Sequence, residues 1–289
     1  MTATSTSATV LGLGRMGSAI AGLFLEGGRT VTVWNRSDGK AAELVTAGAV
    51  EASSVAEAVA ASPFVLTMLF DAEAVLATLK QAGPALKDKT VLNLSTGRPD
   101  EARAIGAYVE EQGGRYLDGG VFGVPQTIGT KESLTIYSGS PDAKAQHADL
   151  IALLGSTKYL GADHGLGSLN DMAVLGGMYG LFAGFFQAVA MVATEGATAG
   201  EFTKELLLPW LRETVELLPA LAEEIDAGDF PVSFSDLDVN QAGLDNILKT
   251  SRDQGASTEL LEPLARLFAA QAEKGHGKSG FTRVIEELR

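Results

Sequence analysis

The chain has 289 residues, with 36 acidic against 22 basic side chains, a formal net charge of −14 and no cysteine. This charge argues against a protein that binds nucleic acid or an anionic membrane, because a negative surface repels phosphate groups. The absence of cysteine excludes disulfides, thiolate metal sites and a cysteine nucleophile, and the presence of only three histidines argues against a zinc enzyme.

The first eight residues, MTATSTSA, form a polar segment without the basic and apolar regions of a secretory signal, so we expect a cytoplasmic protein. The following part of the chain alternates between short apolar runs and segments of helical spacing. This alternation predicts βαβ units in a parallel sheet with helices on both faces. Predicted strands cover residues 8–14, 30–35, 64–69, 90–94, 115–118, 133–138 and 157–160, and predicted helices cover 15–28, 40–47, 72–80 and 99–112.

Residues 172–194 carry no charge and are numerous enough to span a bilayer. Their flanks, Asp171 and Glu195, are acidic, which is contrary to the basic flank of a membrane span. A helix that is apolar all round must be covered on every side. We therefore expect a buried helix of a soluble protein, covered with the help of a second subunit.

Beyond this segment the pattern predicts helices at about 200–225, 236–254, 258–273 and 280–288, and no strand. The sequence therefore predicts an α/β protein in three parts. These are a doubly wound domain over residues 1–162, an interdomain helix over 163–195 and an all-helical domain over 196–289.

The segment Gly12-Leu13-Gly14-Arg15-Met16-Gly17 fits the GxGxxG pattern, directly after the first predicted strand and at the start of the first predicted helix. In this context the first glycine allows a tight turn, the second a close approach to a pyrophosphate, and the third close packing of helix on strand. The free N–H groups at the helix N-terminus then bind the anion. We predict a dinucleotide-binding Rossmann domain.

The end of the second predicted strand indicates which dinucleotide binds. An NAD enzyme places a carboxylate there for the ribose 2′-hydroxyl, whereas this chain has Asn35, Arg36 and Ser37, with Lys40 close by. Arg36 offers a planar fork and Lys40 a point charge for a 2′-phosphate. We therefore predict NADP(H) as the cofactor; the alternative is that Arg36 and Lys40 are solvated surface charges.

These motifs resemble those of the NADPH-dependent imine reductases, within the β-hydroxyacid dehydrogenase superfamily, and the resemblance spans the whole chain. It is carried by GLGRMG at 12–17, by WNRS at 34–37 with Lys40, and by residues 161–165 before the uncharged helix. The resemblance implies a Rossmann domain, a long interdomain helix and an all-helical C-terminal domain in a domain-swapped homodimer. The residues that resemble the reductive aminases within the family are Asn93, Asp171, Tyr179, Trp210 and Gln241.

Two departures from the hydroxyacid dehydrogenases affect the expected substrate. Asp171 stands where that superfamily has a lysine on the long helix. The stretch Asp118-Gly-Gly-Val-Phe122-Gly-Val124-Pro125 corresponds to its Ser-Gly-Gly turn for the substrate carboxylate and lacks the serine. Both changes favour an uncharged or cationic substrate. The alternatives are an enzyme of the 3-hydroxyacid dehydrogenase type and a catalytically silent NADP-binding protein, because fold does not determine function.

The resemblance implies hydride transfer from NADPH to the carbon of an imine or iminium, with imine formation from ketone and amine. Asp171 would take a proton from the amine, Tyr179 would orient the substrate or donate a proton, and Asn93 would bind the reacting heteroatom or the nicotinamide ribose. Position alone also allows Asp171 to be a carboxylate stabilised by the helix dipole, and Tyr179 to be a core residue.

The remaining site predictions follow from the same reasoning. The substrate pocket is expected to contain Trp210, Gln241, Asn240, Phe122, Val124, Met178 and Phe182. The cofactor is expected to contact Gly12, Leu13, Gly14, Arg15, Met16, Gly17, Asn35, Arg36, Ser37, Lys40, Leu69, Phe70, Asn93, Ser95 and Thr96. Expected partners are small imines, ketones and amines and a second copy of the chain, with no metal, nucleic acid or membrane, and the three histidines are expected at the surface.

Overall fold

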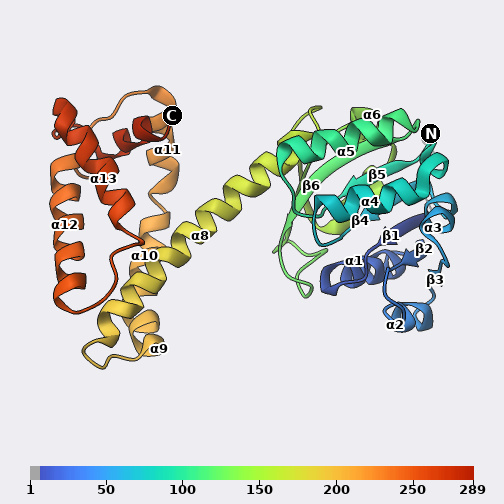
Figure 1. The fold of residues 1–289 in the computed structure, drawn as a ribbon, viewed down its shortest axis with the longest axis horizontal. Coiled ribbons are helices and arrows are strands. Elements are labelled where there is room, and N and C mark those ends of the chain that lie inside the picture. Colours follow the sequence, from blue (N-terminus) through green and yellow to red (C-terminus); the bar gives the residue numbers. More distant parts are fainter. Residues whose placement is uncertain (1–6) are drawn as a thin grey trace. The chain divides into compact units, whose positions relative to one another are not determined.

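A computed structural model describes residues 7–289, so most of the polar segment at the start of the chain lies outside the described residues. The chain divides into two compact units, one ending at Gly176 and the other covering Gly177–Arg289 (Figure 1). The boundary falls within a single long helix, α8 (Gly165–Ala193).

The first unit is built on an eight-stranded sheet in the order β3-β2-β1-β4-β5-β6-β7-β8. Its helices cover both faces of the sheet (Figure 1). The strands are β1 (Ser7–Leu11), β2 (Thr30–Trp34), β3 (Val50–Glu51), β4 (Phe64–Thr67), β5 (Thr90–Asn93), β6 (Arg115–Phe122), β7 (Leu134–Gly139) and β8 (Ser156–Tyr159). The helices of this unit before α8 are α1 (Arg15–Glu26), α2 (Ala42–Thr46), α3 (Val55–Ala61), α4 (Ala72–Ala82), α5 (Pro99–Glu111), α6 (Pro141–Gln146) and α7 (Ala148–Ile151).

The core consists of two apolar clusters. Along each central strand, successive residues belong alternately to one cluster and to the other. Val10 and Leu92 belong to one cluster, and their chain neighbours Leu11 and Val91 belong to the other. Successive side chains of a strand point to opposite faces of a sheet, so the clusters lie on opposite faces. The apolar runs of β1, β4 and β5 are therefore continuous, as is typical of strands buried on both faces.

The sheet is mixed, and the expectation of a parallel sheet is wrong for one pair of strands. β6 and β7 are antiparallel, with Phe122 opposite Leu134, whereas the other neighbouring strands are parallel. No α-helix lies between the two strands, and a parallel pair requires a crossover connection of a dozen residues or more. The short connection therefore returns the chain in the opposite direction.

The start of α8 is fixed to the sheet by three side chains that accept hydrogen bonds from its first N–H groups. Asp163 accepts from the N–H of Gly165 at 2.8 Å, and Ser138 of β7 accepts from that of Gly167 at 2.7 Å. Asp118 of β6 accepts from the N–H of Ser168 at 3.1 Å. These N–H groups have no partner within the helix, so the three acceptors explain why the helix begins here.

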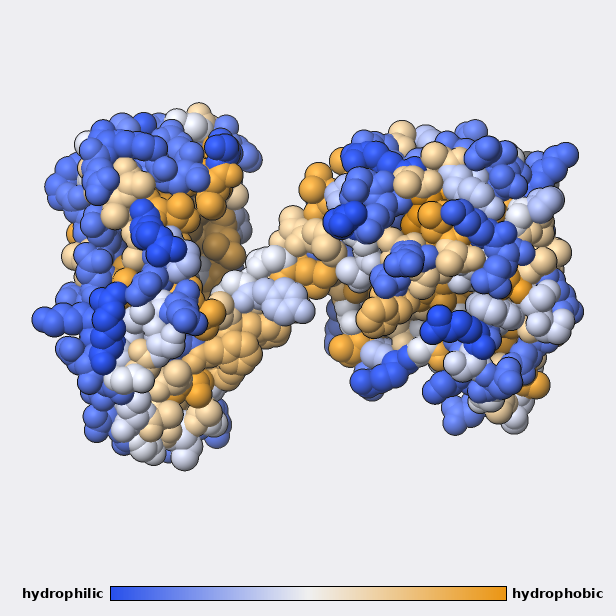
Figure 2. Space-filling view, viewed as in Figure 1, coloured by the Kyte–Doolittle hydropathy of each residue, from blue (hydrophilic) through white to orange (hydrophobic). Residues whose placement is uncertain are grey.

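Beyond its first turns, α8 is largely uncovered within the single chain. The fold of one chain therefore does not bury this helix. Only 6% of its most apolar stretch is buried, and within residues 7–289 it is the single helix that has the length and composition to cross a membrane. Figure 2 shows hydrophobic side chains along its exposed surface. The expectation that a second subunit is needed stays a prediction.

The second unit is helical, as predicted, but its helices are shorter than the predicted segments. They are α9 (Ala199–Phe202), a π-helical turn (Thr203–Leu207), α10 (Leu208–Val215), α11 (Leu218–Ala227), α12 (Leu237–Asp253), α13 (Glu262–Gln271), a second π-helical turn (Ala272–His276) and a 3₁₀ helix (Phe281–Leu288). An apolar hollow of about 340 Å³ lies between α8 and the α10 region. It is lined by Leu181, Phe182, Phe185, Phe186, Thr203, Leu207, Leu208 and Leu211.

The expectation that all three histidines lie at the surface is wrong for His147. This residue lies between α6 and α7 and is fully buried, with its ring against that of Phe64 at 5.1 Å between centroids. Burial lowers its pKa to about 4. His164 is partly buried and contacts Glu110 of α5 at 3.0 Å.

Candidate active site

The glycine-rich turn after β1 has the geometry that the motif predicts. Gly12 has a φ of +100°, and a Cβ there would lie 2.3 Å from the Met68 carbonyl oxygen. A Cβ on Gly17 would lie 1.9 Å from the Gly12 carbonyl oxygen, whereas one on Gly14 would have no neighbour within 4 Å. Gly12 and Gly17 therefore permit close packing of backbone, and the open side of Gly14 leaves room for a pyrophosphate beside the N-terminus of α1.

A cavity of about 720 Å³ lies beside this turn, at the carboxyl ends of β1, β2 and β4. Nine of the residues predicted to contact the cofactor line it, namely Gly12, Gly14, Arg15, Met16, Asn35, Arg36, Ser37, Leu69 and Phe70. Sequence reasoning missed the wall formed by the end of β4 and by α4. That wall contains Met68, Asp71, Glu73, Ala74, Ala77 and Thr78, and Trp34 completes the lining.

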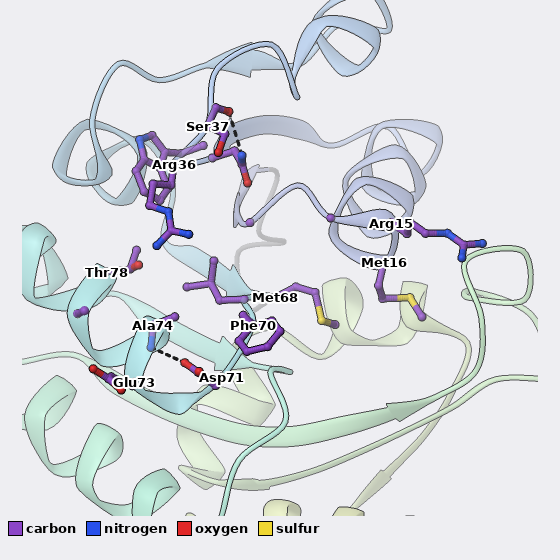
Figure 3. A pocket seen from close by; sticks show the side chains of 16 residues that line it. Arg15, Met16, Arg36, Ser37, Met68, Phe70, Asp71, Glu73, Ala74 and Thr78 are labelled. Atoms are coloured by element: carbon purple, nitrogen blue, oxygen red, sulfur yellow. Dashed lines mark hydrogen bonds between the residues drawn. The ribbon is translucent and has the colours of Figure 1, made fainter.

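The loop after β2 is tied to the glycine turn. Asn35 accepts a hydrogen bond from the N–H of Leu13 at 2.9 Å and donates one to the Ser37 carbonyl at 2.9 Å. Figure 3 shows Arg36 directed into the cavity from this loop, with α4 on the opposite side. The structure divides the two predicted basic residues, because Lys40 is exposed and is not part of the cavity lining.

Two predicted cofactor residues have unexpected placements. Arg15 belongs to the lining, but its guanidinium extends away from Arg36 (Figure 3). Phe70 is 92% exposed, so its ring offers an uncovered apolar surface at the cavity. Two further predicted cofactor residues, Ser95 and Thr96, are not part of the cavity lining. The Ser95 hydroxyl accepts a hydrogen bond from the N–H of Leu69 at 2.8 Å, and Thr96 is exposed.

The side chain of Asn93, at the end of β5, is buried and directed into the protein. Its Oδ1 accepts from the Thr67 hydroxyl at 2.7 Å and from the Ser95 N–H at 3.1 Å, and its Nδ2 donates to Asp118 Oδ1 at 3.0 Å. These bonds use most of its hydrogen-bonding capacity. Its predicted contact with the reacting heteroatom or with the ribose stays a prediction.

Asp118 of β6 is a carboxylate that sequence reasoning missed, and it is fully buried. It accepts hydrogen bonds from Asn93, from the Tyr116 hydroxyl at 2.9 Å, and from both the N–H and the hydroxyl of Ser168. No cation pairs with it within residues 7–289. Burial raises its pKa, and the hydrogen bonds oppose this rise.

Asp171 lies one helical turn after Ser168 and is 5% exposed. Its carboxylate packs against the backbone of β6, because a Cβ on Gly120 would lie 2.4 Å from Asp171 Oδ1. Burial, and then the negative charge of Asp118, raise its pKa to about 6. The site role of Asp171 and its alternative as a carboxylate stabilised by the helix dipole both stay predictions.

The predicted substrate residues fall in both units. In the first unit, Phe122 ends β6 and is partly buried, and Val124 follows it with 52% exposure. In the second unit, several side chains are exposed: Tyr179, Trp210, Met178 and Phe182. There Gln241 is partly buried on α12, and Asn240 donates from Nδ2 to the Asp236 carbonyl at 2.8 Å and to Ser235. The site role of Tyr179 stays a prediction.

Comparison with known proteins shows the family. Residues 163–289 match the model "NADPH-dependent reductive aminase-like, C-terminal domain", and residues 7–161 match "NAD binding domain of 6-phosphogluconate dehydrogenase". An NADPH-dependent reductive aminase of Aspergillus oryzae is 37% identical over 97% of this chain and 96% of its own length. The chain belongs to the reductive aminase family.

Solved structures agree with this assignment. A reductive aminase from Aspergillus terreus, in complex with NADPH and ethyl levulinate, is 42% identical, covers 99% of this chain and 100% of its own, and has a TM-score of 0.93. An imine reductase from Myxococcus stipitatus, in complex with NADP+, is 27% identical with a TM-score of 0.92, over 98% of this chain and 100% of its own. The Rossmann domain and the helical C-terminal domain are thus those of imine reductases.

Proposed function

We propose that this member of the reductive aminase family uses NADPH to reduce imines and iminium ions, and that it forms them from ketones and amines. The observation that carries the proposal is the buried, unpaired carboxylate of Asp171, where the wider superfamily has a lysine. A reductive aminase from Aspergillus terreus, 42% identical, is known in complex with NADPH4, cyclohexanone and allyl amine. A carboxylate favours a cationic nitrogen, as a lysine favours a developing alkoxide.

The residues of the cavity fit NADPH. The open backbone at Gly14 and the N-terminus of α1 would bind the pyrophosphate. Arg36 would hold the 2′-phosphate, together with Asn35 and Ser37. When bound, NADPH supplies the hydride that reduces the C=N carbon.

Asp171 is suited to move a proton at the substrate nitrogen. Its pKa of about 6 places it close to neutral pH, where a group can both accept and return a proton. In its ionised form it takes a proton from the amine nitrogen as the C–N bond forms and returns this proton to the carbinolamine oxygen, which leaves as water. Ionised again, it acts as counter-charge to the iminium. We propose that Tyr179 orients the substrate or donates a proton, and that Asn93, held by the network around Asp118, binds the reacting heteroatom or the nicotinamide ribose.

The remaining substrate residues, Trp210, Gln241, Asn240, Met178 and Phe182, are proposed to complete the pocket in a domain-swapped homodimer. The uncovered apolar surface of α8 and the apolar hollow beside it support a second copy of the chain as the covering partner. We propose that this homodimer works in the cytoplasm.

The test is oxidation of NADPH with a cyclic imine or with a ketone plus an amine, compared with reduction of NADP+ by 3-hydroxy acids. The first two substrate sets should turn over and the third should not. In Asp171→Ala, turnover should fall by about 10²- to 10⁴-fold, the usual contribution of a positioned acid or base, while NADPH binding measured by fluorescence is retained. Unchanged turnover would remove the role of Asp171, and turnover with 3-hydroxy acids alone would favour the dehydrogenase alternative.

A further inference from the structure

Asp118 and Asp171 form a pair of buried carboxylates with no cation between them in the described part of the chain. Asp118 is fully enclosed by four hydrogen bonds, whereas Asp171 has none from residues 7–289. Leaving two carboxylates unneutralised in a low-dielectric site is costly. Such a site therefore favours a cation that binds at the free member of the pair.

We propose that Asp118 is a positioning residue for the reaction, which fixes the Asn93 amide and the first turns of α8 and adds a second negative charge that directs the substrate nitrogen, as a cation, to Asp171. This inference rests on the proposed function. Asp118 itself has no free oxygen for a substrate, so it acts through its neighbours.

The positioning follows from where the four donors come from. Asn93 lies on β5, Tyr116 is on β6 itself, and Ser168 belongs to α8 and precedes Asp171 by three residues. Because Ser168 gives both its N–H and its hydroxyl to one oxygen of Asp118, rotation or sliding of this turn would break two bonds at once. Residues three apart lie on the same side of a helix. The two hydrogen bonds between Ser168 and Asp118 therefore also hold Asp171 next to Gly120.

The electrostatic part follows from the charges around Asp171. Asp118 is ionisable and close enough to raise the pKa of Asp171, and the Tyr116 hydroxyl stays protonated because burial and Asp118 raise its pKa well above 10. Asn93, from β5, is neutral. The other titratable groups near the start of α8 have partners of their own: Arg103 forms an ion pair with Asp163 at 2.9 Å, and the His164 ring contacts Glu110 at 3.0 Å.

The experiment compares Asp118→Asn with Asp163→Asn across pH. Both changes remove a carboxylate that accepts a hydrogen bond from a backbone N–H at the start of α8, that of Ser168 for Asp118 and that of Gly165 for Asp163. Asp163 differs in being half exposed and paired with Arg103. If ionised Asp171 is the active form, turnover rises with pH through its pKa. In Asp118→Asn this midpoint should move to lower pH, because the neighbouring negative charge is gone, whereas in Asp163→Asn it should stay at the wild-type value. Equal midpoints in wild type and Asp118→Asn would overturn the proposal.

Asp118→Asn places an amide against the donors of Ser168 and Asn93, so this variant can fail to fold. The reciprocal measurement avoids it, because coupling between two sites is mutual. Carbon NMR of labelled aspartate should show the Asp118 carboxyl titrating at lower pH in Asp171→Asn than in wild type. An unshifted Asp118 titration would overturn the proposal. The NMR result does not depend on turnover, so absence of amination by the wild type would contradict the proposed function separately.

Discussion

Arg36 and Lys40 follow the same strand and carry the same charge, yet the structure gives them different surroundings. Arg36 is directed into the cofactor cavity, whereas Lys40 is exposed outside its lining. A charge-assisted hydrogen bond contributes about 1.5–3 kcal/mol, so Arg36→Ala should weaken NADPH binding roughly 10- to 100-fold. NADH binding should change little, because NADH lacks the 2′-phosphate.

The matched control is Lys40→Ala, which removes an equal charge from the same loop and should have the smaller effect. The measurement is the ratio of NADPH to NADH affinity in each variant, by fluorescence titration. A ratio that stays at the wild-type value in Arg36→Ala would exclude it as the 2′-phosphate ligand.

The residues that could be predicted from sequence are those whose chemistry is local. The three glycines of the turn and the Asn35-Arg36-Ser37 segment each lie next to a strand end, and their positions follow from the motif. Asp118 could not be found this way, since its partners Asn93 and Ser168 lie 25 and 50 residues away. Its carboxylate is meaningful only once β5, β6 and α8 are packed together.

At the scale of elements, long periodic segments were predicted well and short or unusual ones were not. β1, β2, α1 and α5 match the predicted segments within a few residues. The short β3 and α3 were missed, because two- and seven-residue elements give too little periodicity. The direction of β7 was missed because periodicity carries no information on strand direction.

The junction between α6 and α7 makes stability depend on pH through His147. Its pKa is lowered to about 4 in the folded protein, chiefly by burial, against an ordinary value of 6.5. The unfolded chain therefore binds the proton first as pH falls. The free energy of unfolding should decrease from about pH 6.5 down to about pH 4, with up to ~3 kcal/mol lost through this group, and no further loss from it below pH 4.

Denaturant unfolding at several pH values measures this effect, with His147→Leu compared with wild type. In the variant, the free energy of unfolding should decrease less between pH 6.5 and 4 than in the wild type. The decrease that is due to carboxylates should be the same in both proteins. His276→Gln is the control, because His276 is not buried, and it should follow the wild-type curve. Parallel curves for wild type and His147→Leu would contradict the assignment.

At the scale of the molecule, the uncovered surface of α8 has to be reconciled with a net charge of −14. A membrane could cover an apolar helix, but acidic flanks and an acidic protein oppose contact with anionic lipid. In the proposed homodimer, a second copy offers the same uncharged helix and covers this surface by apolar contact. Phe186, which is 58% exposed on α8 and lines the apolar hollow, is therefore expected to be buried in the homodimer.

If the chain forms the proposed homodimer, Phe186→Asp should convert it into a monomer, because each copy loses about 1.5–3 kcal/mol of apolar burial and gains a charge that the interface would have to desolvate. Light scattering after gel filtration without detergent measures the mass. The monomer should still bind NADPH, since the cofactor cavity lies in the first unit, but it should lose imine reduction if the partner completes the substrate pocket. Leu288→Asp, at an exposed apolar position near the C-terminus, is the control and should leave the mass unchanged. A wild-type chain that is monomeric and active, or that requires detergent to stay in solution, would contradict the homodimer.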